Sequence, residues 1–265
     1  MSAAASVVGT ELLVEVRDRV LYATLNRPDK HNALRLALLD AIRLTFVEQA
    51  TSDNLVAAVL TGAGTRSFAA GGDLRELDGV RGRAAAEQME RDARAALDAV
   101  RAFPVPVVAA LNGNALGGGA ELAVACDFRV VARGATLAFV QGRIGVSTGW
   151  GGGIDLHQIV GRARALRLLA TCEAVDAARG LEIGLFDHVA AEGQDIAAAV
   201  EDFLAPLRRQ HPQVMRGFKA LADAYRSGAD RAAMAAVERR HFVDTWLDED
   251  HWRSVAKVLP AKRPA

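Results

Sequence analysis

The chain has only two cysteines in its 265 residues, Cys126 and Cys172. They lie far apart in the sequence, so they do not form the Cys-x-x-Cys spacing of a metal site. Each falls in an apolar stretch that we expect to be helical, and free cysteine is among the most buried residue types. We therefore predict two buried thiols in a reducing compartment, and no metal ion.

The sequence also lacks an excess of either charge, because 32 basic residues balance 32 acidic residues. Zero net charge argues against general affinity for nucleic acid, although it is compatible with a local basic patch for a phosphate group. No run of about 18 apolar residues suggests a membrane span. Residues 1–10 lack the basic region and long apolar core of a signal peptide. These absences predict a cytoplasmic protein that binds neither nucleic acid nor a membrane.

Apolar residues are plentiful and make up 51% of the chain, which is enough for a large core. Their spacing predicts strands that alternate with helices in the first half, including a helix that begins at Asn32. The strand candidates are residues 11–17, 20–26, 55–61, 106–111, 127–132 and 136–139. This order predicts an α/β fold. After Gly161 the patterns are helical, and we place the boundary so that residues 1–190 form the core and residues 191–265 a C-terminal helical region.

The most informative stretch runs from Asn112 to Cys126 and reads NGNALGGGAELAVAC. Three glycines at a helix start lower helix propensity by roughly 1 kcal/mol each relative to alanine, so a compensating role is expected. Close approach of the backbone to a ligand is the usual role of such glycines. The first N–H groups of a helix have no partner within it and lie at the positive end of its dipole. They therefore suit a group that is, or becomes, an anion.

A second glycine-containing loop follows the strand candidate at residues 55–61. It reads GAGTRS and leads into FAAGGDL at residues 68–74. Two loops that each follow a strand and each offer a free N–H can hold one oxygen atom between them. This is the arrangement of an oxyanion hole, in which losing one donor costs about 10²–10³ in rate.

These two stretches resemble the signatures of the crotonase (enoyl-CoA hydratase/isomerase) superfamily, and LNRPDKHNAL at residues 25–34 resembles its N-terminal signature. The resemblance implies a ClpP-like spiral of repeated ββα units. It also implies C-terminal helices that join copies of the chain into trimers or dimers of trimers (hexamers). The N–H groups of Gly72 and Gly118 are then expected to bind the thioester oxygen of an acyl-CoA as it becomes an enolate. CoA is part of that substrate, and no separate cofactor is expected.

Glu121, in the first turn of the glycine-rich helix, is the main candidate for acid–base chemistry, although its charge would complement the helix dipole without any catalytic role. Hydratases of the family carry a second glutamate, and the two carboxylates hold the attacking water. At the matching position this chain has Arg143, which does not release a proton because its pKa is above about 12. A missing general acid or base costs about 10²–10⁴ in rate, which disfavours hydration by the two-glutamate mechanism.

The stretch from Gly145 to Gly152, GVSTGWGG, resembles the ethylmalonyl-CoA/methylmalonyl-CoA decarboxylase-like branch, which has Trp-Gly-Gly in this loop. Loss of CO2 from a malonyl-type thioester leaves an enolate for the oxyanion hole and then needs one proton donor. Our first hypothesis is therefore this lyase reaction. Enoyl-CoA hydratase or isomerase activity is the alternative, because isomerisation needs only one shuttling base. A non-catalytic member that binds acyl-CoA is the third hypothesis.

The remaining site candidates are residues that would bind the substrate. Arg143 suits a carboxylate, which it can grip with two hydrogen bonds, but it equally suits an ion pair on the surface or between subunits. Trp150 either lines the acyl pocket or packs in the core. The residues that the resemblance places around the CoA adenine and a CoA phosphate are Ala70, Leu74, Arg75 and Lys30. The two basic residues of this set are alternatively solvated surface charges.

Overall fold

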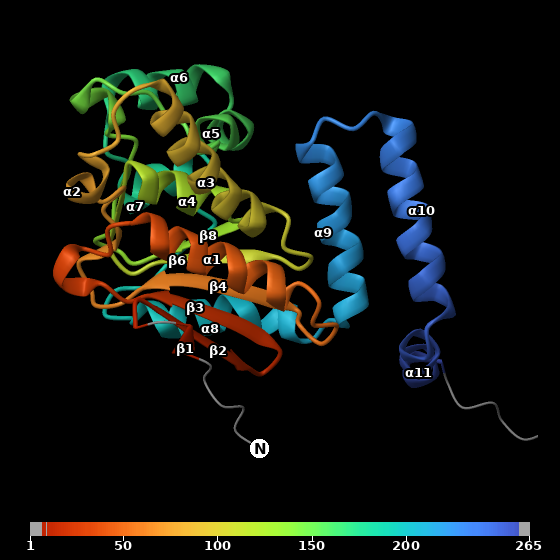
Figure 1. Ribbon diagram of the computed structural model, residues 1–265. Helices are drawn as coiled ribbons and strands as arrows, with labels where there is room; N and C mark the ends of the chain where they lie inside the picture. Colours follow the sequence, from red (N-terminus) through yellow and green to blue (C-terminus); the bar gives the residue numbers. More distant parts are fainter. Residues whose placement is uncertain (1–6, 9, 260–265) are drawn as a thin grey trace, which may run out of the picture.

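The computed structural model describes residues 7–8 and 10–259. Its main sheet has seven strands in the order β1-β2-β3-β4-β6-β8-β10 (Figure 1). Strands β1 to β3 pair antiparallel, and every later pair in this sheet is parallel. The strands are β1 (Val7–Val8), β2 (Leu12–Arg17), β3 (Val20–Leu25), β4 (Ala57–Gly62), β6 (Val107–Leu111), β8 (Phe128–Val131) and β10 (His188–Val189).

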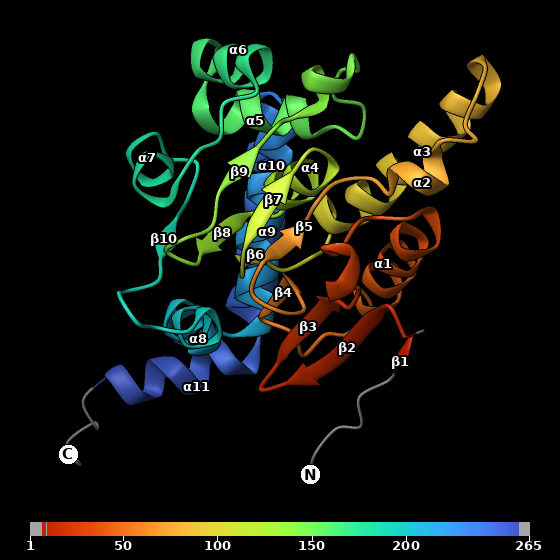
Figure 2. The same cartoon turned by 90° about the vertical axis from the view of Figure 1, so that its left-hand side faces the viewer.

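A second, smaller sheet has three parallel strands, β5 (Ser67–Ala69), β7 (Asn114–Leu116) and β9 (Leu137–Ala138). Each of them follows a parallel strand of the main sheet along the chain, so the unit of one long and one short strand repeats three times. Figure 2 shows the three short strands side by side, with α4 (Gly118–Ala125) next to them. The loops that leave β5 and β7 therefore start at the same edge of the small sheet.

Helices cover both faces of the main sheet. α1 (Leu36–Gln49) and α3 (Arg83–Arg101) pack together over one face, and α8 (Ile196–Arg208) covers the other (Figure 1). β6 is buried at every position, as expected for a parallel strand covered on both sides. The shorter helices of the spiral are η1 (Pro28–Lys30), α2 (Leu74–Leu77), η2 (Gln141–Ile144), α5 (Gly152–Val160), α6 (Arg162–Thr171) and α7 (Ala177–Glu182). The predicted α/β class is confirmed.

One predicted element boundary is wrong. Asn32 does not begin a helix, because α1 starts at Leu36 and Asn32 has a left-handed backbone with φ of 54°. Its side chain is fully buried, and its amide nitrogen donates to the carbonyl oxygens of Ala63 (3.0 Å) and Ser67 (2.8 Å). Asn32 therefore joins the N-terminal signature to the loop between β4 and β5.

The two cysteines agree with their prediction. Cys126 and Cys172 are both buried and neither forms a disulfide. Burial raises the pKa of the Cys126 thiol to about 12, with the charge of Asp127 adding to the effect. A thiol with such a pKa is not a reactive nucleophile near neutral pH, so its place is in the core.

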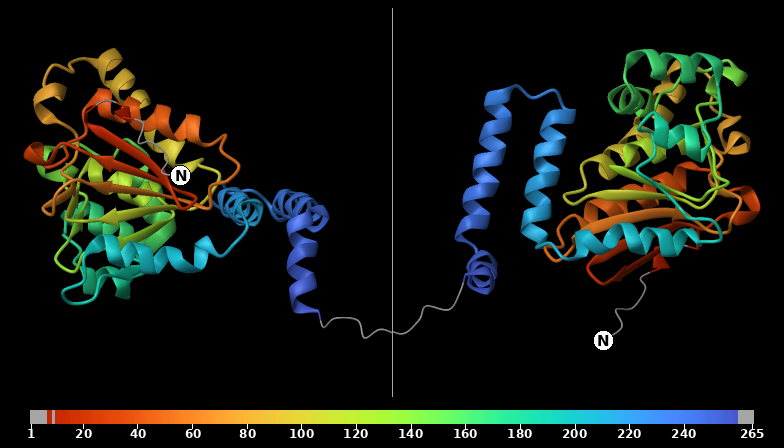
Figure 3. Two further views of the ribbon diagram at one scale, coloured as in Figure 1. Left: turned by 90° about the horizontal axis from the view of Figure 1, so that it is seen from below. Right: turned by 180° about the vertical axis from the view of Figure 1, so that it is seen from behind.

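Three further helices, α9 (Pro212–Arg226), α10 (Arg231–Leu247) and α11 (Glu249–Val258), stand beside the spiral (Figures 1 and 3). α8 still packs on the sheet, so the helices that leave the spiral begin after the expected division at 190/191. Exposed aromatic rings cluster on α10 and α11: the Trp246 ring centroid lies 5.5 Å from that of Phe242 and 5.7 Å from that of Trp252. The expected contact between copies of the chain stays a prediction, and this cluster is a suitable place for it.

A buried lysine attaches α9 to the spiral. The Lys219 Nζ lies 2.6 Å from Asp127 Oδ1, at the end of α4, and 3.0 Å from Asp223 Oδ1. Its side chain is only 2% exposed. Removing one partner from a buried ion pair leaves the other charge uncompensated.

We therefore expect Lys219→Met to lower the free energy of unfolding by about 3 kcal/mol. Thermal unfolding followed by circular dichroism measures this change, and Lys257→Met on the exposed face of α11 is the control. An unchanged melting temperature in Lys219→Met would show that the ion pairs do not hold α9 in place.

Within residues 7–8 and 10–259, no helix combines the length and apolar character needed to cross a membrane. The expectation about a signal peptide concerns residues 1–10, and most of these lie outside the described part of the chain.

Candidate active site

The two predicted glycine loops lie against each other at the edge of the small sheet (Figure 2). β5 and β7 pair with Ala69 opposite Ala115. Gly71, just after β5, has φ of 103°, and a Cβ there would lie 3.1 Å from the Leu116 carbonyl oxygen and 3.5 Å from the Gly118 nitrogen. Glycine is required at this position because other residues rarely adopt that backbone conformation. The close approach brings the Gly118 nitrogen next to the first loop.

The N–H groups of Gly72 and Gly118 are the two predicted oxyanion donors. Within the described part of the chain, neither of them donates a hydrogen bond to another residue. Gly118 is the first residue of α4, where the N–H groups have no partner inside the helix. Two N–H groups on adjoining loops are therefore left without an internal partner, and their binding of one substrate oxygen stays a prediction.

The Trp150 indole forms a wall beside both donors. A Cβ on Gly118 would lie 2.2 Å from Cζ3 of Trp150, and a Cβ on Gly72 would lie 3.5 Å from its Cη2. Leu77, at the end of α2, approaches the same Gly72 position to 2.9 Å. The indole is 8% exposed, so it belongs both to the edge of the core and to the site. Packing of Trp150 in the core is thus confirmed, and its contact with an acyl chain stays a prediction.

Glu121 lies one turn after Gly118 on α4 and is almost completely buried, at 2% exposed. Its Oε2 accepts hydrogen bonds from the backbone N–H groups of Trp150 (2.9 Å) and Gly152 (3.0 Å). Its Oε1 accepts one from Gln141 Nε2 (2.9 Å) and a long one from the Gly149 N–H (3.5 Å). The carboxylate thus joins α4 to the start of α5. Of its two oxygens, Oε1 has the weaker second bond and therefore the spare capacity to take a proton.

Two effects act on the protonation of Glu121. Burial raises the pKa of this carboxyl above its ordinary value, and the hydrogen bonds from Gly152, Trp150, Gly149 and Gln141 work in the opposite direction, with burial the larger effect. A carboxylate with a raised pKa holds a proton more readily near neutral pH than an exposed glutamate does. Its environment therefore suits a group that both takes up and returns a proton.

Gln141 is a site residue that the sequence did not single out. Its Nε2 donates to Glu121, while its own Oε1 is buried without a hydrogen-bond partner among the described residues. Amide nitrogen and oxygen exchange places when the side chain turns over. The unpartnered oxygen could then accept a hydrogen bond from a protonated Glu121, so Gln141 can serve both protonation states.

The side chain of Arg143 bonds away from Glu121, at the end of α6. It lies on η2 and is exposed, and its Nη2 donates to the Cys172 carbonyl oxygen at 2.8 Å, at the end of α6. Glu121 has no hydrogen bond to Arg143; its bonds from this region come from Gln141 and from residues 149–152. The grip of Arg143 on a substrate carboxylate stays a prediction. What the structure shows is that the side chain of Arg143 bonds to the end of α6; its match to the second glutamate of hydratases remains what the resemblance implies.

The residues expected to bind CoA come together from two signatures. Leu34 and Gly72 form a parallel bridge, and the Ala70 N–H donates to the His31 carbonyl oxygen at 3.0 Å. This joins the segment that carries Lys30 to the one that carries Ala70. The members of the set are placed as follows: Lys30, Leu74 and Arg75 are exposed, and Ala70 is half-buried. The structure thus provides an open edge with two basic side chains, and contact with CoA stays a prediction.

Asp73 fixes this edge. It caps α2 by accepting a hydrogen bond from the Arg75 N–H at 3.3 Å, and it pairs with Arg27 at 3.0 Å. Slight burial would raise the pKa of Asp73, but the hydrogen bond and charge of Arg27 hold it below its ordinary value. A carboxylate committed to these two partners has a structural role.

Comparison with known proteins agrees with this geometry. The family described as Enoyl-CoA hydratase/isomerase matches residues 15–259. The chain belongs to this family. It is 31% identical to the 2,3-dehydroadipyl-CoA hydratase of Escherichia coli strain K12, over 96% of this chain and 98% of that protein. Among solved structures, Pseudomonas aeruginosa DspI is similar over 100% of this chain and 99% of its own, with 31% identity and a TM-score of 0.89.

An enoyl-CoA hydratase from Mycobacterium smegmatis gives a TM-score of 0.87 at 28% identity, over 96% of this chain and 98% of its own. The chain is therefore an enzyme of the crotonase superfamily with the crotonase fold, as its three signatures predicted. The relatives do not indicate the decarboxylase-like branch that the stretch from Gly145 to Gly152 suggested.

Proposed function

We propose that this enoyl-CoA hydratase/isomerase family member moves the double bond of an enoyl-CoA thioester by a single-base proton shuttle. One observation carries the proposal. Glu121 lies one turn after Gly118 and is held by the turn at 149–152, while Arg143, at the position that the resemblance assigns to the second glutamate, bonds to Cys172. Hydration needs two groups to hold and split a water molecule, whereas isomerisation needs one group that removes a proton and returns it.

In this mechanism the acyl-CoA oxygen accepts hydrogen bonds from the Gly72 and Gly118 N–H groups. Glu121 Oε1 removes a proton from C2 of a 3-enoyl thioester, and the electron pair moves onto the thioester oxygen as a dienolate. The same oxygen then returns the proton at C4, which gives the conjugated 2-enoyl thioester and regenerates the carboxylate. Donors that are fixed before the reaction stabilise the developing charge without reorganisation.

The test offers the enzyme three substrates: 3-hexenoyl-CoA, crotonyl-CoA and ethylmalonyl-CoA. Mass spectrometry separates the outcomes, because isomerisation leaves the mass unchanged, hydration adds water and decarboxylation removes CO2. We expect 3-hexenoyl-CoA to gain the ultraviolet absorbance of a conjugated thioester. Faster water addition to crotonyl-CoA, or loss of CO2 from ethylmalonyl-CoA alone, would overturn the proposal.

Decarboxylation of a malonyl-type thioester is the second candidate, favoured by the apolar Trp150 wall beside the oxyanion donors. Such a wall suits a site that destabilises a substrate carboxylate by removing its water. It ranks second because the matching family and two of the relatives reported above carry the names of hydratases and isomerases. Failure of all three substrates would favour a non-catalytic protein that binds acyl-CoA.

The pH dependence of isomerisation reports directly on Glu121. The base must be ionised to start the reaction, so the rate falls as the pH drops through the pKa of this carboxyl. Because burial raises that pKa, we expect the acid limb to lie at higher pH than the pKa of a free glutamate. The measurement is the turnover rate of the isomerisation reaction at saturating substrate, followed as a function of pH. A flat profile down to the pKa of free glutamate would argue that another group carries the proton.

A further inference from the structure

We propose that Arg101, which lies on α3 outside the catalytic loops, positions the Trp150 indole and thereby sets the length of acyl chain that the site accepts. The selectivity half of this inference rests on the proposed function. Arg101 is a positioning residue, because it acts through the Trp150 carbonyl oxygen and through Asp155. No motif of the sequence includes it.

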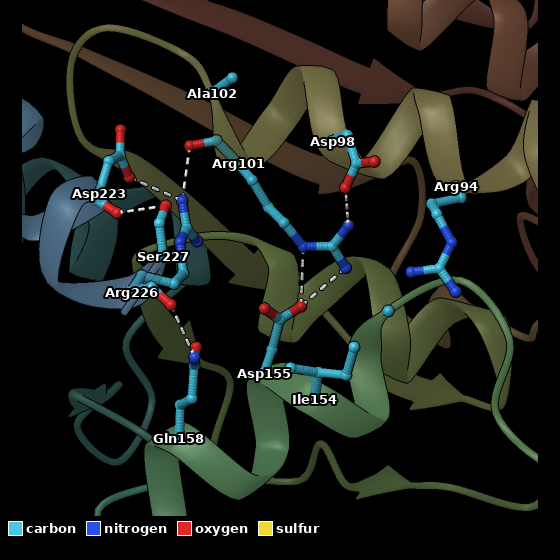
Figure 4. A pocket seen from close by; sticks show the side chains of 11 residues that line it. Arg94, Asp98, Arg101, Ala102, Ile154, Asp155, Gln158, Asp223, Arg226 and Ser227 are labelled. Carbon is cyan, nitrogen blue, oxygen red and sulfur yellow. Dashed lines mark hydrogen bonds and ion pairs between the residues drawn. The ribbon is translucent and has the colours of Figure 1, made fainter. Parts of the chain in front are cut away.

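Arg101 holds the Trp150 loop by its backbone. Its Nη2 donates to the Trp150 carbonyl oxygen at 3.0 Å. Its Nε and Nη2 both donate to Asp155 Oδ2, at 2.9 and 2.7 Å, and Asp155 lies on α5 directly after this loop. Both side chains are buried, at 13% and 6% exposed. The guanidinium therefore joins α3 to the Trp150 carbonyl oxygen and to Asp155 on α5, and Figure 4 shows the bonds to Asp155.

The loop is shaped around this guanidinium. Gly151 has φ of 92°, and a Cβ there would lie 2.7 Å from Arg101 Nη2 and 3.0 Å from its Cζ. Other residues rarely adopt that backbone conformation, and none would leave room for Arg101. Gly151 thus serves the contact with Arg101, while the glycines at 72 and 118 serve the substrate side.

The turn from 149 to 152 is held from two sides. Its N–H groups at Gly149, Trp150 and Gly152 point to Glu121, and its carbonyl oxygens at Gly149 and Trp150 accept from Arg94 and Arg101. A backbone that is fixed through both its donors and its acceptors leaves the attached side chain little freedom. The indole consequently keeps its contact with Gly118 and its place beside Gly72.

The side of the loop away from the substrate faces a cavity of about 450 Å³ and not a packed core. Figure 4 shows Arg101 projecting across this cavity toward Asp155, with Asp98 beside it and Arg226 on the other wall. If Arg101 were removed, no other side chain would fill the space beside Gly151. The turn could then move back into the cavity, and the indole would withdraw from the acyl site.

The test compares two arginines of the same cavity. Arg101→Met removes the bonds to the loop, while Arg226→Met removes a half-buried arginine that bonds to Asp223 and to the Arg101 carbonyl oxygen but not to the loop. We expect Arg101→Met to raise the ratio of kcat/KM for ten-carbon over four-carbon enoyl-CoA about tenfold. Arg226→Met should keep the wild-type ratio even if both variants lose similar stability. The ratio for Arg101→Lys should fall between the ratios of the wild type and Arg101→Met. This variant replaces Arg101→Met in the test if the methionine variant does not fold.

A second measurement does not depend on turnover. The chain has three tryptophans, so 5-fluorotryptophan labelling gives three fluorine resonances, and Trp150→Phe identifies one of them. We expect Arg101→Met, or Arg101→Lys to a smaller degree, to shift or broaden the Trp150 resonance, and Arg226→Met to leave it in place. An unmoved resonance would overturn the positioning role. A moved resonance with an unchanged ratio would overturn the selectivity role. If no enoyl-CoA reacts, the proposed function fails while the resonance still decides the positioning role.

Discussion

Glu121→Gln is expected to lower kcat for double-bond isomerisation by about 10²–10⁴, the usual contribution of a general acid–base group. The substitution keeps the size of the side chain but removes the base. It also turns one oxygen into an NH2 group, which would face the N–H groups that now donate to Glu121. KM should change much less than kcat, because the proposed mechanism places the thioester oxygen on Gly72 and Gly118 and not on Glu121. Steady-state kinetics below the melting temperature of the variant measures both parameters.

Glu249→Gln is the matched control. Glu249 also lies in the first turn of a helix, α11, but it is exposed and far from the oxyanion loops in the sequence. If Glu121 had only a structural role, its variant would lose stability but no activity, while Glu249→Gln would lose little of either. Full activity in Glu121→Gln would remove Glu121 from the mechanism.

The sequence allowed the oxyanion loops to be predicted because their requirement is local and steric. Gly71 and Gly117, one in each loop, have positive φ angles of 103° and 53°. Both backbone conformations leave glycine in the sequence at fixed distances from apolar strands. A feature that depends on one residue and its immediate neighbours can be recognised without knowing the fold.

The partners of Glu121 could not be predicted in the same way. Its donors come from Gln141 and from the turn at 149–152, about 20 to 31 positions further along the chain. Arg101 lies 54 positions from Asp155, on a helix whose exposed face is rich in charged residues. The neighbouring sequence of an arginine in such a helix does not show whether its side chain is solvated or bonds to a distant loop. The difference appears only in the fold, where the end of α3 lies close enough to α5 for Arg101 to bond to Asp155.

Asn32 shows how a local rule can mislead. Asparagine before an apolar helical pattern is a common N-cap, so the sequence favoured a helix that starts there. The same short amide is also tolerated in the left-handed backbone region and can bond to nearby carbonyl groups. Here its two bonds to the loop between β4 and β5 decide its place. The sequence alone does not distinguish an asparagine that caps a helix from one that adopts a left-handed backbone in a loop.

Gly118→Ala is expected to lower kcat/KM by about 10²–10³, the cost of losing one oxyanion donor. The new Cβ would lie 2.2 Å from Trp150 Cζ3 and within 3 Å of two more atoms of the same ring, so either the indole or the start of α4 has to move. The backbone of Gly118 is ordinary, since its φ is not in the left-handed region. The expected loss therefore comes from the collision. Gly134→Ala, where nothing lies within 4 Å of the added Cβ, should keep wild-type activity.

A double variant separates the two causes of that loss. Trp150→Leu makes room for the new methyl group, so Gly118→Ala should cost much less activity in the Trp150→Leu background than in the wild type. The comparison is a double-mutant cycle, in which coupling between two residues in contact shows as a departure from additivity. An equal loss in both backgrounds would mean that the alanine disturbs the N–H of residue 118 directly, without acting through the indole. Full activity of the single Gly118→Ala variant would contradict the predicted cost, because neither a displaced indole nor a displaced start of α4 would then affect the reaction.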